Sequence, residues 1–215
     1  MITAILTGDI EDSSNIDTRF RGKLSETLYS IIEDFKSVSP DVCIDIFRGD
    51  SFQIEVKEPE RAVRLAILLR AGLRAATPIL GTKPWDARIS IGLGSVSYRT
   101  DRLGTSDGEA FVNSGHGLDE IGKRKLTVRT PWADFDESVD LLTEFVDDIV
   151  SNWTIPQSAV VYQKLLTNKS QKEIADDKKQ TKANISIILG KSKASLIRKY
   201  IKRCETLLKD KLQKI

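Results

Sequence analysis

Hydrophobic residues in the first 130 positions follow two different periods. Two segments repeat apolar residues every three or four positions, which predicts amphipathic helices over residues 18–38 and 59–76, and a shorter helix is expected near 109–121. Five runs have the alternating or continuous apolar character of strands, and they lie at residues 2–7, 42–47, 52–56, 87–93 and 126–129. The order of these elements predicts an α+β fold whose first unit has the ferredoxin-like βαββαβ arrangement.

The segment at residues 134–153 has the clearest helical pattern in the chain. Its apolar residues step by four and three along a narrow seam, which consists of Phe135, Val139, Leu142, Val146, Ile149 and Trp153. Such a seam fits a helix packed on one domain, and it also fits a connector that pairs two protomers. The seam is too short to choose between these interpretations.

Beyond Ile155-Pro156 the pattern becomes that of several short helices. A first helix is expected over 158–166, and residues 170–173 (Ser-Gln-Lys-Glu) have the spacing of a capping box at the start of a second. A polar turn at 176–180 separates the second helix from a third, predicted at 181–190. A last helix has an apolar stripe that core packing and dimerisation explain equally well, made of Leu196, Ile197, Tyr200, Ile201, Cys204, Leu207 and Leu208.

Charge divides the chain into an acidic body and a basic tail. Residues 1–150 contain 18 Lys and Arg against 26 Asp and Glu, a net charge of −8, whereas residues 151–215 contain 15 against 5, a net charge of +10. This asymmetry suggests domains with different partners, and nucleic acid is the natural partner of the basic part. We therefore divide the chain into a domain at 1–133, a connector helix at 134–154 and an all-α domain at 155–215.

The composition is that of a globular protein with ample chain for a hydrophobic core. No apolar run approaches the ~20 residues that span a bilayer, so we expect no membrane partner. The first residues lack a basic region and a cleavage site, so we expect no signal peptide. Cys43 and Cys204 have neither a disulfide pattern nor zinc spacing and are expected to be small core residues. These features favour a cytoplasmic protein.

Two acidic turns form the candidate site. Asp9 follows the first apolar run, and Asp50 lies in the turn between the second and third predicted strands. In the βαββαβ arrangement the end of strand one faces the start of strand three, so the two carboxylates become neighbours. Adjacent carboxylates repel unless a proton or cation intervenes, and a hard divalent ion such as Mg²⁺ or Mn²⁺ fits. Taken alone, each turn is also typical of an ordinary Gly-Asp loop.

Three segments resemble class III nucleotidyl cyclases, in an order and spacing that agree over about residues 2–130. Residues 7–13 (Thr-Gly-Asp-Ile-Glu-Asp-Ser) resemble the first metal-binding segment of that family. Residues 48–52 (Arg-Gly-Asp-Ser-Phe) resemble its Gly-Asp hairpin, and residues 110–113 (Ala-Phe-Val-Asn) resemble the short helix whose Asn contacts the nucleotide.

This resemblance implies two-metal, in-line phosphoryl transfer. The implied metal ligands are Asp9, Asp50 and the carbonyl of Ile10. The implied nucleotide-binding residues are Gly49, Asn113, Lys123, Arg124 and Lys125.

The sequence departs from the cyclase pattern at two positions. The transition-state arginine expected one helical turn after Asn113 is replaced by Gly117, and the neighbouring His116 is mostly neutral at pH 7. The base-selecting lysine position is Ile46. Loss of such an arginine lowers phosphoryl-transfer rates by a factor of ~10³ or more. These departures favour a nucleotide-binding or degenerate domain over an efficient cyclase.

The basic tail resembles the helix-turn-helix of bacterial regulators in residues 172–175 (Lys-Glu-Ile-Ala), a turn, and Thr181 followed by Ile185-Ser186. Apolar residues would pack the two helices, namely Ile174, Ala175, Ile185, Ile188 and Leu189. The resemblance implies major-groove contacts by the second helix and phosphate contacts by nearby lysines. The implied DNA-binding residues are Lys178, Lys179, Thr181, Lys182, Ala183, Asn184, Ser186 and Lys191. A helical bundle with a solvated lysine face is the plain alternative.

Taken whole, the chain resembles the SatD-like bacterial proteins, which join a cyclase-like domain to a helix-turn-helix. We therefore expect a homodimeric transcriptional regulator that binds double-stranded DNA, with an N-terminal domain that senses a metal or nucleotide or serves as a dimerising scaffold. The alternative is an active nucleotidyl cyclase with a DNA-binding tail. A third hypothesis is a purely structural dimerisation domain with a DNA-binding head, in which the carboxylates are vestigial.

Overall fold

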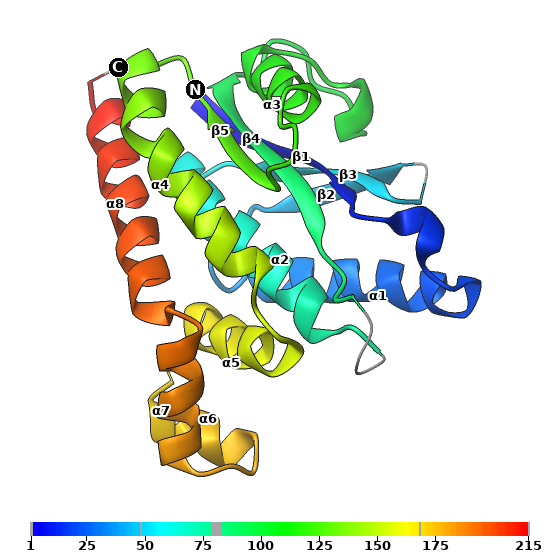
Figure 1. Cartoon of the computed structure of the whole chain (residues 1–215). Coiled ribbons are helices and arrows are strands. Elements are labelled where there is room, and N and C mark those ends of the chain that lie inside the picture. The colour runs from blue at the N-terminus through cyan, green and yellow to red at the C-terminus, as the bar shows by residue number, and fades with distance from the viewer. Residues whose placement is uncertain (1, 48, 79–82, 168, 215) are drawn as a thin grey trace.

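A five-stranded sheet lies at the centre of the computed structural model, which describes residues 2–47, 49–78, 83–167 and 169–214 (Figure 1). Its strands are β1 (Ile2–Ile10), β2 (Cys43–Phe47), β3 (Ser51–Val56), β4 (Ala87–Ser95) and β5 (Leu126–Arg129). They lie in the order β2-β3-β1-β4-β5, and every neighbouring pair is antiparallel except β4 and β5. The predicted α+β class and the βαββαβ order of the first part are confirmed.

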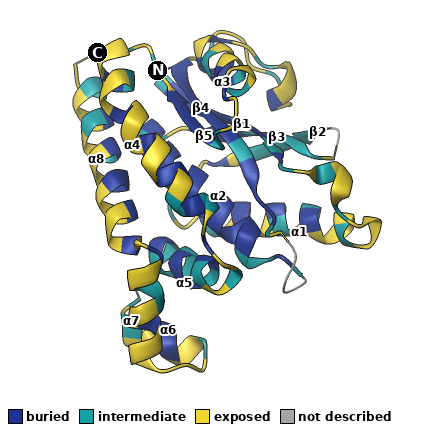
Figure 2. Ribbon diagram, in the orientation of Figure 1, coloured by how far each residue is buried: buried dark blue, intermediate teal, exposed yellow. Residues whose placement is uncertain are grey.

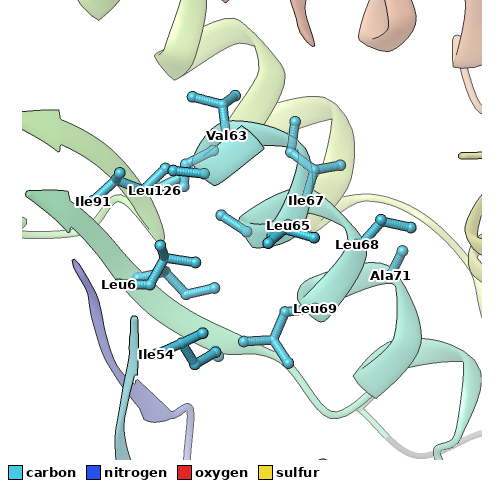
Figure 3. Packing of buried hydrophobic residues seen from close by; sticks show 14 of the residues in the cluster. Leu6, Ile54, Val63, Leu65, Ile67, Leu68, Leu69, Ala71, Ile91 and Leu126 are labelled. Atoms are coloured by element: carbon cyan, nitrogen blue, oxygen red, sulfur yellow. The ribbon is translucent and has the colours of Figure 1, made fainter. Parts of the chain in front are cut away.

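Helices α1 (Thr18–Phe35) and α2 (Ala62–Ala75) cover one face of the sheet. Figure 3 shows Leu69 of α2 on the side of the helix that faces the strands, where Leu6 and Ile54 belong to the same apolar cluster. The alternate residues of these strands point to the other face, as the period of a strand requires. That second face carries the candidate site.

Helix α3 (Glu109–Asp119) lies on the second face, across β1 and β4. Two glycines of β4 permit its close approach. A Cβ on Gly92 would lie 2.2 Å from the backbone nitrogen of Ser114, and one on Gly94 would lie 2.7 Å from that of Ala110. Helix α3 therefore packs directly on the backbone of β4. A side chain at either glycine would displace α3 from the sheet.

Two long helices, α4 (Ala133–Ser151) and α8 (Ala194–Leu212), run side by side at the edge of the molecule (Figure 1). Together with α5 (Ile155–Leu166) they add apolar residues to the same core as the sheet and α2. Helices α6 (Gln171–Asp177) and α7 (Lys182–Lys191) instead share a small cluster with α5, formed by Val160, Ile174, Ala175 and Ile185. Figure 2 shows that α6 and α7 are exposed over most of their surface.

The seam predicted on α4 faces the core, with one exception. Phe135, Val139 and Val146 are buried, whereas Leu142 is 45% exposed. The Trp153 indole, just beyond the helix, is buried and donates a hydrogen bond to the Ser192 carbonyl at 2.8 Å. The seam thus packs α4 on its own chain. A second, exposed apolar face lies beside it, where Leu141 and Phe145 are each 61% exposed.

A buried ionic network joins α2, the start of β4 and α4. Arg70 is fully buried and binds Asp86 through Nε at 2.8 Å and Nη2 at 2.9 Å, and it binds Asp147 through Nη1 at 2.6 Å. Arg74 also binds Asp86, at 2.8 Å, and donates to the carbonyls of Ser151 and Trp153 at the end of α4. Burial lowers the pKa of Arg70, but the charges of Asp86 and Asp147 outweigh it and raise that pKa overall.

Several predicted boundaries differ from the structure. Helix α1 ends at Phe35 rather than at residue 38, and a 3₁₀ turn at Pro59–Arg61 precedes α2. Helix α5 begins at Ile155, because Thr154 and Gln157 form a capping box that the sequence analysis missed. In the last helix Leu196 is 52% exposed, so it does not belong to the buried stripe.

Some predictions concern residues that the structure leaves undescribed. Arg48 of the predicted hairpin lies outside the described residues. In the parts of the chain that are described, no helix combines the length and the apolar character that crossing a bilayer requires. Cys204 is buried as expected, whereas Cys43 is exposed.

Candidate functional site

The end of β1 and the start of β3 meet at one edge of the sheet, as the topology predicts. Asp9 pairs with Ser51 in the antiparallel ladder, and the Ile10 amide donates to the Asp50 carbonyl at 2.9 Å. Gly49 in the turn before β3 has a φ of +79°, a conformation that glycine adopts without strain. Residues 40 and 42 positions apart are thereby brought into backbone contact.

The side chain of Asp9 is held by Arg88 of β4. Arg88 is the ladder partner of Asp9, so both side chains point to the second face. The guanidinium donates from Nε at 2.9 Å and from Nη2 at 2.6 Å, one bond to each carboxylate oxygen. This bidentate bond raises the pKa of Arg88. A fixed positive charge therefore already neutralises the carboxylate that the cyclase resemblance assigns to a metal.

Asp50 has different partners. Its Oδ2 accepts a hydrogen bond from the Ser13 hydroxyl at 2.7 Å, and its Oδ1 accepts one from Ser51 at 3.4 Å. The Ile10 side chain is buried in the core. A hollow of about 350 Å³ lies beside the end of β1, but its lining includes Glu11 and Asp12 rather than Asp9 or Asp50.

At this edge of the sheet, a Mg²⁺ or Mn²⁺ ion would have to share Asp9 with Arg88, and the predicted metal site stays a prediction. A divalent ion takes oxygen ligands, and both oxygens of Asp9 already accept one hydrogen bond each from Arg88. Across the described ranges, no group of three or more His, Cys, Asp or Glu residues is placed to hold a metal. Asp9 and Asp50 are adjacent, as the cyclase resemblance implies. The cation bound to Asp9, however, is the Arg88 guanidinium and not a metal ion.

Three of the five positions implied to bind nucleotide make internal contacts. The Asn113 amide donates to the Leu93 carbonyl at 2.7 Å, so it ties α3 to β4. Arg124 binds Asp140 at 2.7 Å and Lys125 binds Glu11 at 2.6 Å. Lys123 is exposed. Their role in nucleotide binding stays a prediction.

Both departures from the cyclase pattern have a packing role. Ile46 contributes its side chain to the main core. Gly117 is buried against β4 and β5, where a Cβ would lie 2.2 Å from Ser90 Oγ and 3.0 Å from Arg129 Cγ. An arginine at position 117 would therefore push α3 away from the sheet.

Substitution of Gly117 by alanine is expected to lower the free energy of unfolding by about 1–3 kcal/mol, because overpacking must move α3 or Ser90. The matched control is Gly115→Ala in the same helix, where a Cβ would meet nothing within 4 Å. That control should be neutral or stabilising by up to about 1 kcal/mol, since alanine favours helices over glycine. Urea denaturation of both variants measures the difference. Equal stability of the two would show that α3 is not in close contact at Gly117.

Sequence reasoning missed Arg88, although a signal was present. Arg88 is the only charged residue of β4, and strand alternation places it opposite the core-facing Ala87 and Ile89. Its pairing with Asp9 depends on the register of β1 and β4, which the sequence alone does not fix.

The second candidate site lies on α6, α7 and the turn between them. The Ser170 hydroxyl accepts from the Glu173 amide and the Glu173 carboxylate accepts from the Ser170 amide, so the predicted capping box is present. The Thr181 hydroxyl caps α7, because it accepts a hydrogen bond from the backbone N–H of Asn184 at 3.1 Å. The φ of Lys179 is +51°, which lets the chain reverse between the helices.

The predicted DNA-binding residues lie together on this exposed part. Lys178 is half-buried, and exposed positions on α7 and its flanks are Lys179, Thr181, Lys182, Ala183, Asn184, Ser186 and Lys191. Ile185 is fully buried, with Ile188 and Leu189 packed beside it. Ile187 is 55% exposed on the same helix, and the sequence analysis had not singled it out.

The comparisons with known proteins found similar folds among solved structures only. No family model and no curated protein matches the sequence. Similar solved structures include the active GGEEF domain of a diguanylate cyclase from Vibrio cholerae, with 17% identity and a TM-score of 0.41 over 60% of this chain and 83% of that chain. The guanylyl cyclase Cya2 has 17% identity and a TM-score of 0.41, covering 55% and 70%. A bacterial light-regulated adenylyl cyclase has 14% identity and a TM-score of 0.44, covering 59% and 74%.

All three matches are described as nucleotide cyclases or their domains, and none as a DNA-binding protein. At these identities and TM-scores the likeness concerns the type of fold and not the chemistry. The resemblance to the SatD-like proteins and to a helix-turn-helix stays a prediction.

Proposed function

We propose that this chain binds double-stranded DNA through α7 and that its sheet domain supports that unit as a scaffold. The observation that carries the proposal is the pairing of α6 and α7 over a small apolar cluster, which leaves several polar and basic residues of α7 exposed together with Ile187. A helix held in this way can enter a major groove. The net charge of +10 over residues 151–215 supplies attraction to phosphates.

Individual residues have distinct roles in this proposal. Asn184 would contact a base edge, since an asparagine amide pairs with adenine through two hydrogen bonds. Exposed Ile187 would lie near thymine methyl groups. Lys178, Lys182 and Lys191 would contact phosphates and fix the position of the helix without reading sequence.

The test begins with selection of binding sites from a pool of random duplexes, using the whole protein. Asn184→Ala should weaken binding to the selected site by about tenfold and relax the preference at one base pair. Lys182→Gln should weaken binding to all duplexes and reduce the salt slope by about one unit.

Asn152→Ala, an exposed asparagine at the end of α4, is the control and should change nothing. Failure to enrich any sequence, together with salt-independent binding, would refute the proposal.

A homodimer is part of this proposal, because paired helices of this kind commonly read two half-sites. Sedimentation equilibrium of the free protein and of its complex with DNA measures the stoichiometry. A selected site without inverted symmetry, bound by one protomer, would remove the dimer from the proposal.

The second candidate function is a nucleotidyl cyclase or a metal- and nucleotide-sensing domain. The adjacency of Asp9 and Asp50 favours it, because it is the backbone arrangement that such a site needs. Incubation with ATP, GTP, CTP and UTP in the presence of Mg²⁺ or Mn²⁺, followed by product analysis, distinguishes an active cyclase from a sensing domain. A cyclic product that disappears in Asp50→Asn would establish the enzyme. A metal-dependent rise of the melting temperature without product would establish a sensor.

A further inference from the structure

A basic hollow lies between α2, the end of α5, α7 and the first half of α8, away from the Asp9–Asp50 edge. Its volume is about 890 Å³, which is within the range of ligand sites. We call it the basic trough and define it by the five cations and one carboxylate that line it: Arg64, Lys164, Arg198, Lys199, Lys202 and Glu205. In Figure 1 the start of α8 lies beside α5 and α7.

The charges of the trough are unbalanced. Glu205 already binds Arg64 at 2.8 Å and Arg61, outside the trough, at 3.5 Å. Within the described part of the chain, the other four cations have no carboxylate within ion-pair distance. Lys164 donates only to the Lys169 carbonyl, at 2.6 Å. Several positive charges that converge on one hollow repel one another, and a bound anion would relieve this repulsion.

The α8 helix directs further positive potential into the trough. Its first residues, Ala194 and Ser195, line the hollow, and no side chain caps the start of the helix. Free amide groups and the helix dipole at such a start attract anions. Arg198, Lys199 and Lys202 follow on the same exposed side of α8, opposite the buried stripe that includes Ile197 and Ile201.

We propose that the basic trough is a binding site for phosphate groups. The ligand chemistry is that of a nucleoside polyphosphate or of successive backbone phosphates of DNA, since both present closely spaced anionic oxygens. Arginine side chains would bind these oxygens bidentately and lysines as point charges. Because Ser186 and Gly190 of α7 also line the trough, a bound phosphate would contact the helix assigned above to base reading.

The test uses the full chain and two double variants. Arg198→Gln/Lys202→Gln removes two trough cations, and Arg203→Gln/Lys209→Gln removes two exposed cations of α8 that do not line the trough. Calorimetric titration with pyrophosphate, ATP and GTP without added metal measures small-ligand binding. If the ligand is a free polyphosphate, wild type binds one molecule, the trough variant binds at least tenfold more weakly, and the control stays within twofold.

If the ligand is the DNA backbone, neither pyrophosphate nor nucleotide binds to wild type. The trough variant then loses DNA affinity and its salt slope falls by about two units, while the control keeps both values. Unchanged binding of small phosphates and of DNA in the trough variant would overturn the proposal. The polyphosphate outcome does not require DNA binding, so it can hold even if the Asn184 experiment fails. Circular dichroism of both variants confirms that the helices are intact.

Discussion

Replacement of Asp86 by alanine is expected to lower the free energy of unfolding by about 3–5 kcal/mol, the cost of leaving a buried charge without its partner. Asp86 is fully buried and accepts two hydrogen bonds from Arg70, one from Arg74 and one from the Ala87 amide. Without it, the Arg70 guanidinium retains Asp147 and Ser151 as partners and has no access to water. The loss is a large share of the stability of an ordinary domain.

Urea denaturation followed by circular dichroism measures this effect. The matched control is Arg124→Ala, which removes an ion pair whose side chains are 29% and 58% exposed and should change stability by less than about 1 kcal/mol. Asp86→Asn keeps the shape of the side chain and some of its hydrogen bonds. Its free energy of unfolding should therefore lie between those of Asp86→Ala and Arg124→Ala. Equal stability of Asp86→Ala and Arg124→Ala would mean that the network does not join α2 to α4 in solution.

The same residue predicts a pH dependence. Burial acts to raise the pKa of Asp86, but the charges of Arg70 and Arg74 and their hydrogen bonds outweigh it and hold that pKa below its usual value. In the unfolded chain the pKa is about 3.9, so the unfolded state takes up the proton first as the pH falls. The stabilising contribution is therefore complete above about pH 5 and is lost as the pH falls towards the folded-state pKa. The stability difference between wild type and Asp86→Asn should shrink below about pH 4.

Local patterns were sufficient to predict most of the elements. Strand alternation placed β5 at residues 126–129, where it is found, and capping chemistry located the start of α6 at Ser170. The adjacency of Asp9 and Asp50 also followed from sequence, because one topology accounts for the order of strands and helices. These features depend on residues close in sequence or on chain connectivity.

Features that depend on tertiary contacts were not predicted. The Arg70 network brings together α2, β4 and α4, and nothing in a helical period marks an arginine as buried. Leu142 fits the helical seam, yet the width of the α4 contact leaves it 45% exposed. The basic trough combines Arg64 with the cations of α8, which are more than 130 positions away. In each case the decisive neighbour is distant in sequence.

Arg88 decides whether the sheet domain can hold a metal ion. Its guanidinium occupies both oxygens of Asp9, so it competes directly with a divalent cation. A unit charge roughly 5 Å from a divalent cation disfavours binding by on the order of 2 kcal/mol even with the dielectric constant of water. Arg88→Ala should therefore raise the affinity for Mn²⁺ by about 30-fold.

A thermal-shift titration with Mn²⁺ and Mg²⁺ measures this change. Arg129→Ala removes an exposed arginine on the same face of the sheet, paired with Glu120, and serves as the control. The gain in Arg88→Ala should vanish when Asp50→Asn is added, because Asp50 is the second carboxylate at this edge. If wild type and Arg88→Ala bind Mn²⁺ with the same affinity, the Arg88 guanidinium does not stay bound to Asp9 when the protein is in solution. Asp9 would then be available as the metal ligand that the cyclase hypothesis requires, whereas the expected gain would show that the Asp9–Arg88 pair weakens metal binding at this edge.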